Sequence, residues 1–341
     1  MESKLPNFFL ENTPWQNAEN SIWLSTLLTL RRNIIGYPFS KKCTASQKAQ
    51  LEDVLVPSLL QLPEFENGRK WLFSALSPLE KELLFEQKVY PSSPKDSEES
   101  TLVFGSNAHA LLHHFDHLTL CLRSKSFHEL GQSLQRVEEA FEKSLPFAFH
   151  PRFGYLTAKM HECGSGLKIK TFMHLPAMIH LKEELPSHLH LSNFTGSKEG
   201  FPGDVVVVSN HFTLGLTEEE ILKELFTTCT HLKTKEEQLR ENLNGAQESH
   251  IKDLVTRSIG LLKHSYELHI EETLEALSHV KLGLGMKWIS GIEESVVNDL
   301  LFRCQKAHLS LTLSIGTNMS ELTQKRAAYL HEKMHSVESR I

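Results

Sequence analysis

Histidines are crowded into one short stretch of the chain. His109, His113, His114 and His117 lie there together with Asp116. Imidazole nitrogens and carboxylate oxygens form a common ligand set for zinc and related metals. On a strand, His113 and His117 would share one face and His114 would lie on the other, whereas a helix would gather His109 with His113 and His117. Metal binding through this histidine-rich strand is therefore one hypothesis, against the alternative of ordinary polar strand residues.

A second stretch, residues 153–177, combines two predicted strands with a glycine turn. Strand-forming residues precede Gly164-Ser165-Gly166, and an apolar run follows the turn as far as Pro176. The glycines give the backbone the freedom that a tight hairpin needs, and they also allow a ligand to approach the backbone closely. We expect a hairpin here.

Other signatures of chemistry are missing from the sequence. The five cysteines include no Cys-x-x-Cys pair, so neither a zinc knuckle nor a disulfide framework is indicated, and reduced thiols are expected. No Gly-x-x-x-x-Gly-Lys-Ser/Thr loop offers a phosphate site. The net charge of -6 gives no overall attraction for nucleic acid.

Composition and pattern predict how the chain is organised. A hydrophobic fraction of 40% and a charged fraction of 23% are typical of a folded soluble protein. No apolar run approaches the roughly 20 residues of a membrane span, and no signal sequence is recognisable at the start, so a cytoplasmic protein without membrane contact is expected.

The length of 341 residues suggests two domains. Residues 1–89 are predicted to form a small all-helical domain, because capped apolar stretches repeat there at helical spacing. Residues 90–101, rich in proline, serine and charge, are predicted to be a linker. Residues 102–341 interleave short apolar runs with amphipathic helices, at 127–144 and as a pair within 217–271, which predicts an α+β domain.

Three short motifs occur in fixed order around the glycine turn. They are Gly-Tyr-Leu-Thr at 154–157, Gly-Ser-Gly-Leu at 164–167 and His-Leu-Pro-Ala at 174–177. In order and spacing they resemble the ATP:guanido phosphotransferase (phosphagen kinase) family, most closely its bacterial branch, the protein-arginine kinases. The resemblance implies a small helical domain followed by a larger one with a mostly antiparallel sheet flanked by helices.

Further motifs keep the same register along the chain, from about residue 24 to residue 326. They are Arg-Asn at 32–33, Tyr-Pro-Phe at 37–39, Asp-His-Leu at 116–118 and Ser-Asn-x-x-Thr-Leu-Gly at 209–215.

The resemblance implies five arginine positions that hold the nucleotide phosphates in active members. Here these positions are occupied by Leu27, Thr29, Thr119, Lys168 and Ser192. An arginine fork donates paired hydrogen bonds to phosphate oxygens, which uncharged side chains cannot do and which lysine does only as a point charge. We therefore expect a poorly held triphosphate, with Lys168 as the remaining candidate contact.

The resemblance also implies carboxylates that orient and deprotonate the guanidinium substrate. His114, Phe115 and Ser197 occupy three of those glutamate positions, and Glu199 lies close enough to replace Ser197 as a rescue candidate. Lys159 stands at a reactive cysteine and Glu162 at an asparagine. Phosphoryl transfer depends on positioning and charge neutralisation, so few catalytic groups are expected to be intact.

The resemblance and the replaced residues together lead to two hypotheses about function. The leading hypothesis is a catalytically degenerate family member, a pseudokinase without a cofactor that acts as a binding or regulatory protein. The alternative is an active protein-arginine kinase that uses Mg-ATP and rearranged residues. Those residues would be Lys159, Glu162, Lys168, Glu199 and Asp204.

The resemblance further implies a homodimer and protein partners: an activator protein, a heat-shock repressor or the Clp protease system. It also places a phosphoarginine pocket near residues 321–327. Arg326 is kept there, but Leu322 and Thr323 replace an Arg-Asp pair.

Overall fold

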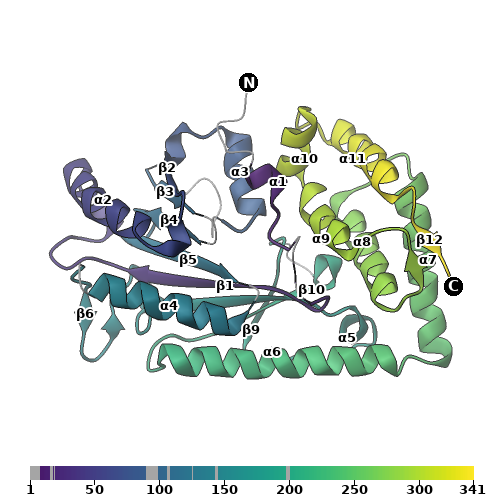
Figure 1. Ribbon diagram of the computed structural model, residues 1–341, viewed down its shortest axis with the longest axis horizontal. Coiled ribbons are helices and arrows are strands. Elements are labelled where there is room, and N and C mark those ends of the chain that lie inside the picture. Colours follow the sequence, from purple (N-terminus) through teal and green to yellow (C-terminus); the bar gives the residue numbers. More distant parts are fainter. Residues whose placement is uncertain are drawn as a thin grey trace.

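The computed structural model describes residues 8–15, 18, 20–89, 99–105, 108–124, 126–142, 145–196 and 200–341. In this part of the chain, eight strands form one antiparallel sheet in the order β2-β3-β4-β5-β1-β8-β10-β9 (Figure 1). The strands are β1 (Trp23–Arg32), β2 (Arg69–Leu72), β3 (Thr101–Phe104), β4 (Ala108–Leu112), β5 (Leu118–Ser124), β8 (Leu167–His174), β9 (His190–Asn193) and β10 (Val205–Ser209). Two short pairs stand apart from it: β6 (Phe149–His150) with β7 (Gly154–Tyr155), and β11 (Ile289–Ser290) with β12 (Glu338–Ser339).

Helices precede, cover and follow this sheet. They are α1 (Phe8–Glu11), α2 (Ala45–Leu60), α3 (Pro78–Glu86), α4 (Phe127–Glu142), α5 (Pro176–His180), α6 (Glu218–Glu241), α7 (Gly245–His264), α8 (Ile270–Gly285), α9 (Glu294–Arg303), α10 (Lys306–Leu313) and α11 (Met319–Met334). Short 3-10 turns are η1 (Ser40–Lys42), η2 (Pro63–Phe65), η3 (Phe73–Ala75), η5 (Met160–Glu162) and η6 (Pro202–Asp204). The α+β class with a large antiparallel sheet is confirmed.

Residues 1–89 differ from the all-helical segment that the sequence predicted. The helices α2 and α3 are present, both with capping boxes, but Trp23–Arg32 is strand β1, hydrogen-bonded between β5 and β8 in the middle of the sheet. Seven successive residues of this strand are buried, so its sequence does not alternate between polar and apolar residues. A strand that is buried on both faces lacks this alternation and is therefore difficult to recognise from the sequence. Residues 90–98 of the predicted linker lie outside the described residues.

The two faces of the sheet pack against different helices. Leu28, Ile169 and Val208 face the core shared with α4 and α6, which lie along one side of the sheet (Figure 1). On the opposite face, Phe172 packs against Trp15, whose ring lies edge-on to Phe302 of α9 at 4.5 Å between centroids. The amphipathic pattern predicted α4 and the helix pair α6 and α7 correctly.

The predicted hairpin at 153–177 is partly as expected. β8 is a full strand, but the preceding segment contributes only Gly154 and Tyr155, bridged to Gly164. At Gly164 φ is +109°, and an added Cβ would lie 2.2 Å from the Thr213 carbonyl oxygen. Close approach of another backbone segment therefore requires this glycine.

None of the described helices is both long and apolar enough to cross a membrane.

Candidate anion-binding pocket

Three neighbouring strands place charged side chains on one face of the sheet. In the register of β1, Thr29 lies opposite Lys168 of β8 on one side and Cys121 of β5 on the other. Two residues before Thr29 on β1, Leu27 lies opposite Lys170 of β8. Residues directly opposite one another across an antiparallel pair share a face. Leu27 and Thr29 of β1 therefore share one face of the sheet with Lys168 and Lys170 of β8. This face is the one opposite α4 and α6.

A pocket of about 170 Å³ opens on this face. Residues of the sheet strands form its floor. The segment after α3, with Lys88 and Val89, forms one wall. Four of its lining residues are cations: Arg31, Lys88, Lys168 and Lys170. The volume is below the 300 to 1,000 Å³ typical of sites for drug-sized ligands. It suits a small anionic group rather than a whole nucleotide.

The lysines of this pocket are held in an unfavourable electrostatic environment. Burial, together with the nearby positive charges, lowers the pKa of Lys88 and the pKa of Lys168 to about 8. Burial also lowers the pKa of Lys170, and the Arg31 guanidinium adds to this effect. Like charges that repel one another in a partly dehydrated site favour an anion that neutralises them.

Arg31, which lines the pocket, has an unused donor. Its Nε forms an ion pair with Glu162 Oε2 at 3.3 Å, while Nη1 is buried without a hydrogen-bond partner among the described residues. A buried unpaired donor of a charged group is costly, so it points to a ligand or a bound water. Lys168 is less available, because its Nζ donates to the Asn210 carbonyl oxygen.

The structure brings together four of the five predicted phosphate positions. Leu27, Thr29, Lys168 and Ser192 all line the pocket. Thr119 is not among the lining residues but pairs with Arg31 across β5 and β1, so it lies on the same face. The residues that sequence reasoning missed are Arg31, Lys88 and Lys170.

Cations surround the predicted guanidinium position. The Lys159 Nζ lies 4.5 Å and the Lys41 Nζ lies 5.2 Å from the centroid of the Phe115 ring. His114 is buried against the same ring. A carboxylate at position 115 would attract a guanidinium, whereas two ammonium groups over an aromatic ring repel it.

The other predicted catalytic residues are placed as follows. Glu162, in η5, is engaged by Arg31. Ser197 and Glu199 lie outside the described residues. Asp204 lines a different cavity, with His180 and His279. The rearranged active-site set is therefore not gathered in one place among the described residues.

The histidine-rich stretch is a hairpin rather than one strand. His109 lies in β4, and His113 and His117 belong to the turn before β5, where His113 has φ of +60°. His117 Nδ1 accepts from the Ile34 N–H, and its Nε2 lies 2.7 Å from the Pro38 carbonyl oxygen. In the described part of the chain, these histidines do not form a group with metal-ligand spacing.

Arg326 has a structural position. Its Nε donates to the Cys304 carbonyl oxygen at 2.8 Å and its Nη1 to the Leu268 carbonyl oxygen at 2.7 Å. Leu322 and Thr323 are buried beside it. This guanidinium is committed to holding α11 against its neighbours.

Comparisons with known proteins agree with this fold. Residues 53–239 match the model of the ATP:guanido phosphotransferase C-terminal catalytic domain, and residues 248–341 match that of the protein-arginine kinase McsB C-terminal domain. A protein-arginine kinase of Chlamydia pneumoniae is 30% identical over 322 residues, 90% of each chain. One of Moorella thermoacetica is 29% identical over 340 residues, 94% of this chain and 97% of the relative.

Solved structures support the same fold at lower identity. A lombricine kinase superposes with a TM-score of 0.54 at 18% identity, over 71% of this chain and 73% of that one. The duplicated taurocyamine kinase of Schistosoma mansoni gives 0.57 at 19% identity, over 75% of this chain and 40% of that one.

The chain thus has the fold of the guanidino kinases. It belongs to the ATP:guanido phosphotransferase family, in its protein-arginine kinase branch.

Proposed function

We propose that this protein is a regulatory pseudokinase that binds a phosphate-type anion and does not phosphorylate arginine. One observation carries the loss of catalysis: Lys41 and Lys159 flank Phe115 where the resemblance implies a guanidinium-binding carboxylate. A substrate guanidinium would be neither oriented nor deprotonated there.

The pocket supports the binding part of the proposal. Lys88, Lys168, Lys170 and Arg31 line a volume of about 170 Å³, large enough for a phosphate or pyrophosphate group. Of these cations only Lys168 stands at a position of the family arginines, so the four together would hold phosphate oxygens without reproducing the paired forks that align ATP for transfer. Mg-ATP would bind through its phosphates.

Action on protein partners in the cytoplasm, as the sequence led us to expect, belongs to the same proposal. A chain that binds an anion and lacks catalytic carboxylates can transmit that binding only through its conformation or its contacts.

Two measurements test the two parts separately. With purified protein, Mg-ATP and an arginine-rich protein substrate, we expect no acid-labile phosphoarginine. Phosphorylation that is lost in Lys168→Met would overturn the assignment as a pseudokinase.

For the pocket, we expect millimolar pyrophosphate or triphosphate to raise the melting temperature at constant ionic strength, because the anion binds only the folded state. Lys170→Met, which keeps an apolar stem in place, should abolish most of the shift. Lys325→Met, on the exposed surface of α11, is the matched control, and its melting temperature should rise as much as that of the unaltered protein. Equal shifts in both variants would refute the pocket.

A further inference from the structure

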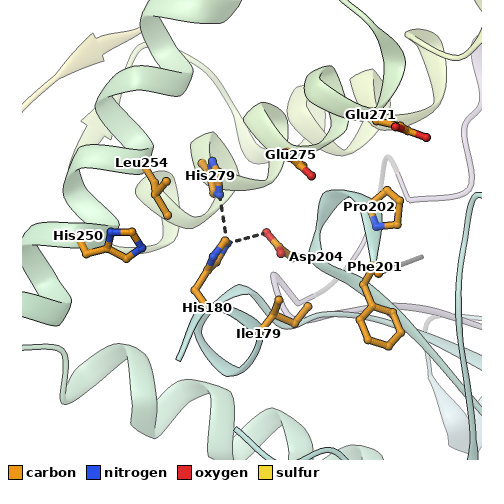
Figure 2. Close-up of a pocket in the computed structure, with 11 residues that line it drawn as sticks. Ile179, His180, Phe201, Pro202, Asp204, His250, Leu254, Glu271, Glu275 and His279 are labelled. Carbon is orange, nitrogen blue, oxygen red and sulfur yellow. Dashed lines mark hydrogen bonds and ion pairs between the residues drawn. The ribbon is translucent and has the colours of Figure 1, made fainter. Parts of the chain in front are cut away.

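A second, larger cavity lies between α5 and η6 on one side and the C-terminal helices α7 and α8 on the other. Its volume is about 590 Å³. His180, Asp204 and His279 come together on its wall, from the last residue of α5, the last of η6 and the middle of α8 (Figure 2). These residues are distant in sequence, and their meeting is a property of the fold.

The three side chains point ligand atoms at one another. His180 Nε2 lies 3.4 Å from Asp204 Oδ2 and 3.1 Å from His279 Nε2, and the three atoms lie within 4.8 Å of one another. Ligands about 2.0 to 2.1 Å from a tetrahedral zinc ion are separated by roughly 3.3 Å. The two short separations match that value, so the cluster needs little adjustment to hold an ion.

Hydrogen bonds behind the cluster fix two of its side chains. Ser258 Oγ lies 2.9 Å from His279 Nδ1, the ring nitrogen that faces away from His180. Ser278 Oγ donates to Asp204 Oδ2 at 2.5 Å, and the serine is itself within 2.7 Å of His174 Nε2. Partners of this kind orient the rings and carboxylates of metal sites and set the histidine tautomer.

The backbone at Asp204 contributes to the same arrangement. Gly203 and Asp204 both have positive φ, +68° and +52°, and Asp204 is 6% exposed. A non-glycine residue in this left-handed region is uncommon and is concentrated at functional positions. The turn directs the carboxylate toward α8 just before β10 begins.

We propose that His180, Asp204 and His279 bind a divalent transition metal ion, with zinc as the best candidate. Two imidazole nitrogens and one carboxylate oxygen suit zinc, cobalt or nickel, whereas magnesium prefers oxygen ligands alone. The remaining coordination position faces the cavity, where Glu275 and His250 line the wall (Figure 2). Water or Glu275 would complete the shell.

The ion would join two parts of the chain. His180 and Asp204 precede and follow β9 in the segment that builds the sheet, whereas His279 belongs to the C-terminal helices. A metal bound by both would fasten α8 to the sheet, so binding should stabilise the packing between these parts.

Titration of zinc into metal-free protein is the direct test. We expect one zinc per chain, a higher melting temperature with zinc, and no comparable effect of magnesium at the same concentration. His279→Gln and His180→Gln should each weaken zinc binding at least tenfold. His188→Gln, in which an exposed histidine outside the cavity is changed, should bind as the unaltered protein does.

Cobalt supplies a readout that does not depend on stability. Tetrahedral Co²⁺ bound to the unaltered protein should give visible absorption bands that zinc displaces and that are lost in His180→Gln. Circular dichroism of each metal-free variant shows whether it is folded. Zinc binding that is equal in the His180, His279 and His188 variants, or absent at micromolar zinc from the unaltered protein, would overturn the proposal.

Discussion

Arg31 and Glu162 form an ion pair in which both side chains are largely buried, with exposures of 12% and 17%. The pair stands at the edge of the cationic pocket and occupies only one side of the guanidinium. Glu162 is thus the carboxylate that competes with an incoming anion for Arg31.

Removing this competitor should strengthen anion binding. In Glu162→Gln, Arg31 is released and a negative charge is lost, so pyrophosphate affinity should rise about threefold to tenfold, the scale of a partly exposed ion pair. Isothermal titration calorimetry measures it. An unchanged or weaker affinity would show that Arg31 does not contact the ligand.

Anion binding and stability should respond to pH in opposite directions. Lys88 and Lys168 have pKa values of about 8 in the folded protein, below the usual lysine value near 10.4. Between these values the unfolded chain binds more protons, so these lysines make the anion-free protein more stable as pH rises from about 8 to 10. The pyrophosphate-induced melting shift should shrink over the same range. Thermal unfolding between pH 8 and 10, with and without pyrophosphate, measures the direction of both changes.

Two glycines should respond differently to the same substitution. Gly164→Ala places Cβ 2.2 Å from the Thr213 carbonyl oxygen at a φ of +109°, which should destabilise the protein by about 3 kcal/mol. Gly131→Ala, inside α4 with open space around it, should stabilise it by about 0.5 to 1 kcal/mol. Urea unfolding compares the two. Similar effects would contradict the close approach at Gly164.

Buried neutral histidines should make the protein sensitive to acid. Burial lowers the pKa of His109 to about 3 and the pKa of His308 to about 4. On unfolding they take up protons below about pH 6.5, so stability is lost as pH falls from there. His109→Gln should lower the pH midpoint of acid unfolding. A midpoint that stays the same would assign the sensitivity to other groups.

The fold could be predicted where its signals are local. Amphipathic helices and caps revealed α3, α4 and α6, and motif order revealed the family. β1 could not be recognised as a strand because its buried run gives no period of two, and neighbouring helices suggested more helix. Its partners β5 and β8 lie far along the chain, so only tertiary contacts identify it.

The site shows the same division. Motif register singled out Leu27, Thr29, Lys168 and Ser192, which the structure places around one pocket, because aligned positions need no knowledge of the sheet. Arg31 and Lys170 escaped notice because they become pocket residues only when β1 and β8 are paired. A search for alternating cations on those strands would have found both.

The central place of β1 has a consequence for how the protein is made. Thr29 pairs with Lys168 and Cys121, so β1 has no strand partner until the chain has grown past residue 124, and it lacks its second partner until the chain has grown past residue 174. During that interval a strand that the folded protein buries along most of its length has open edges and is available to other chains. This segment is where a folding chaperone would be needed most, and the formation of β1 within the sheet should be a late, slow step of assembly.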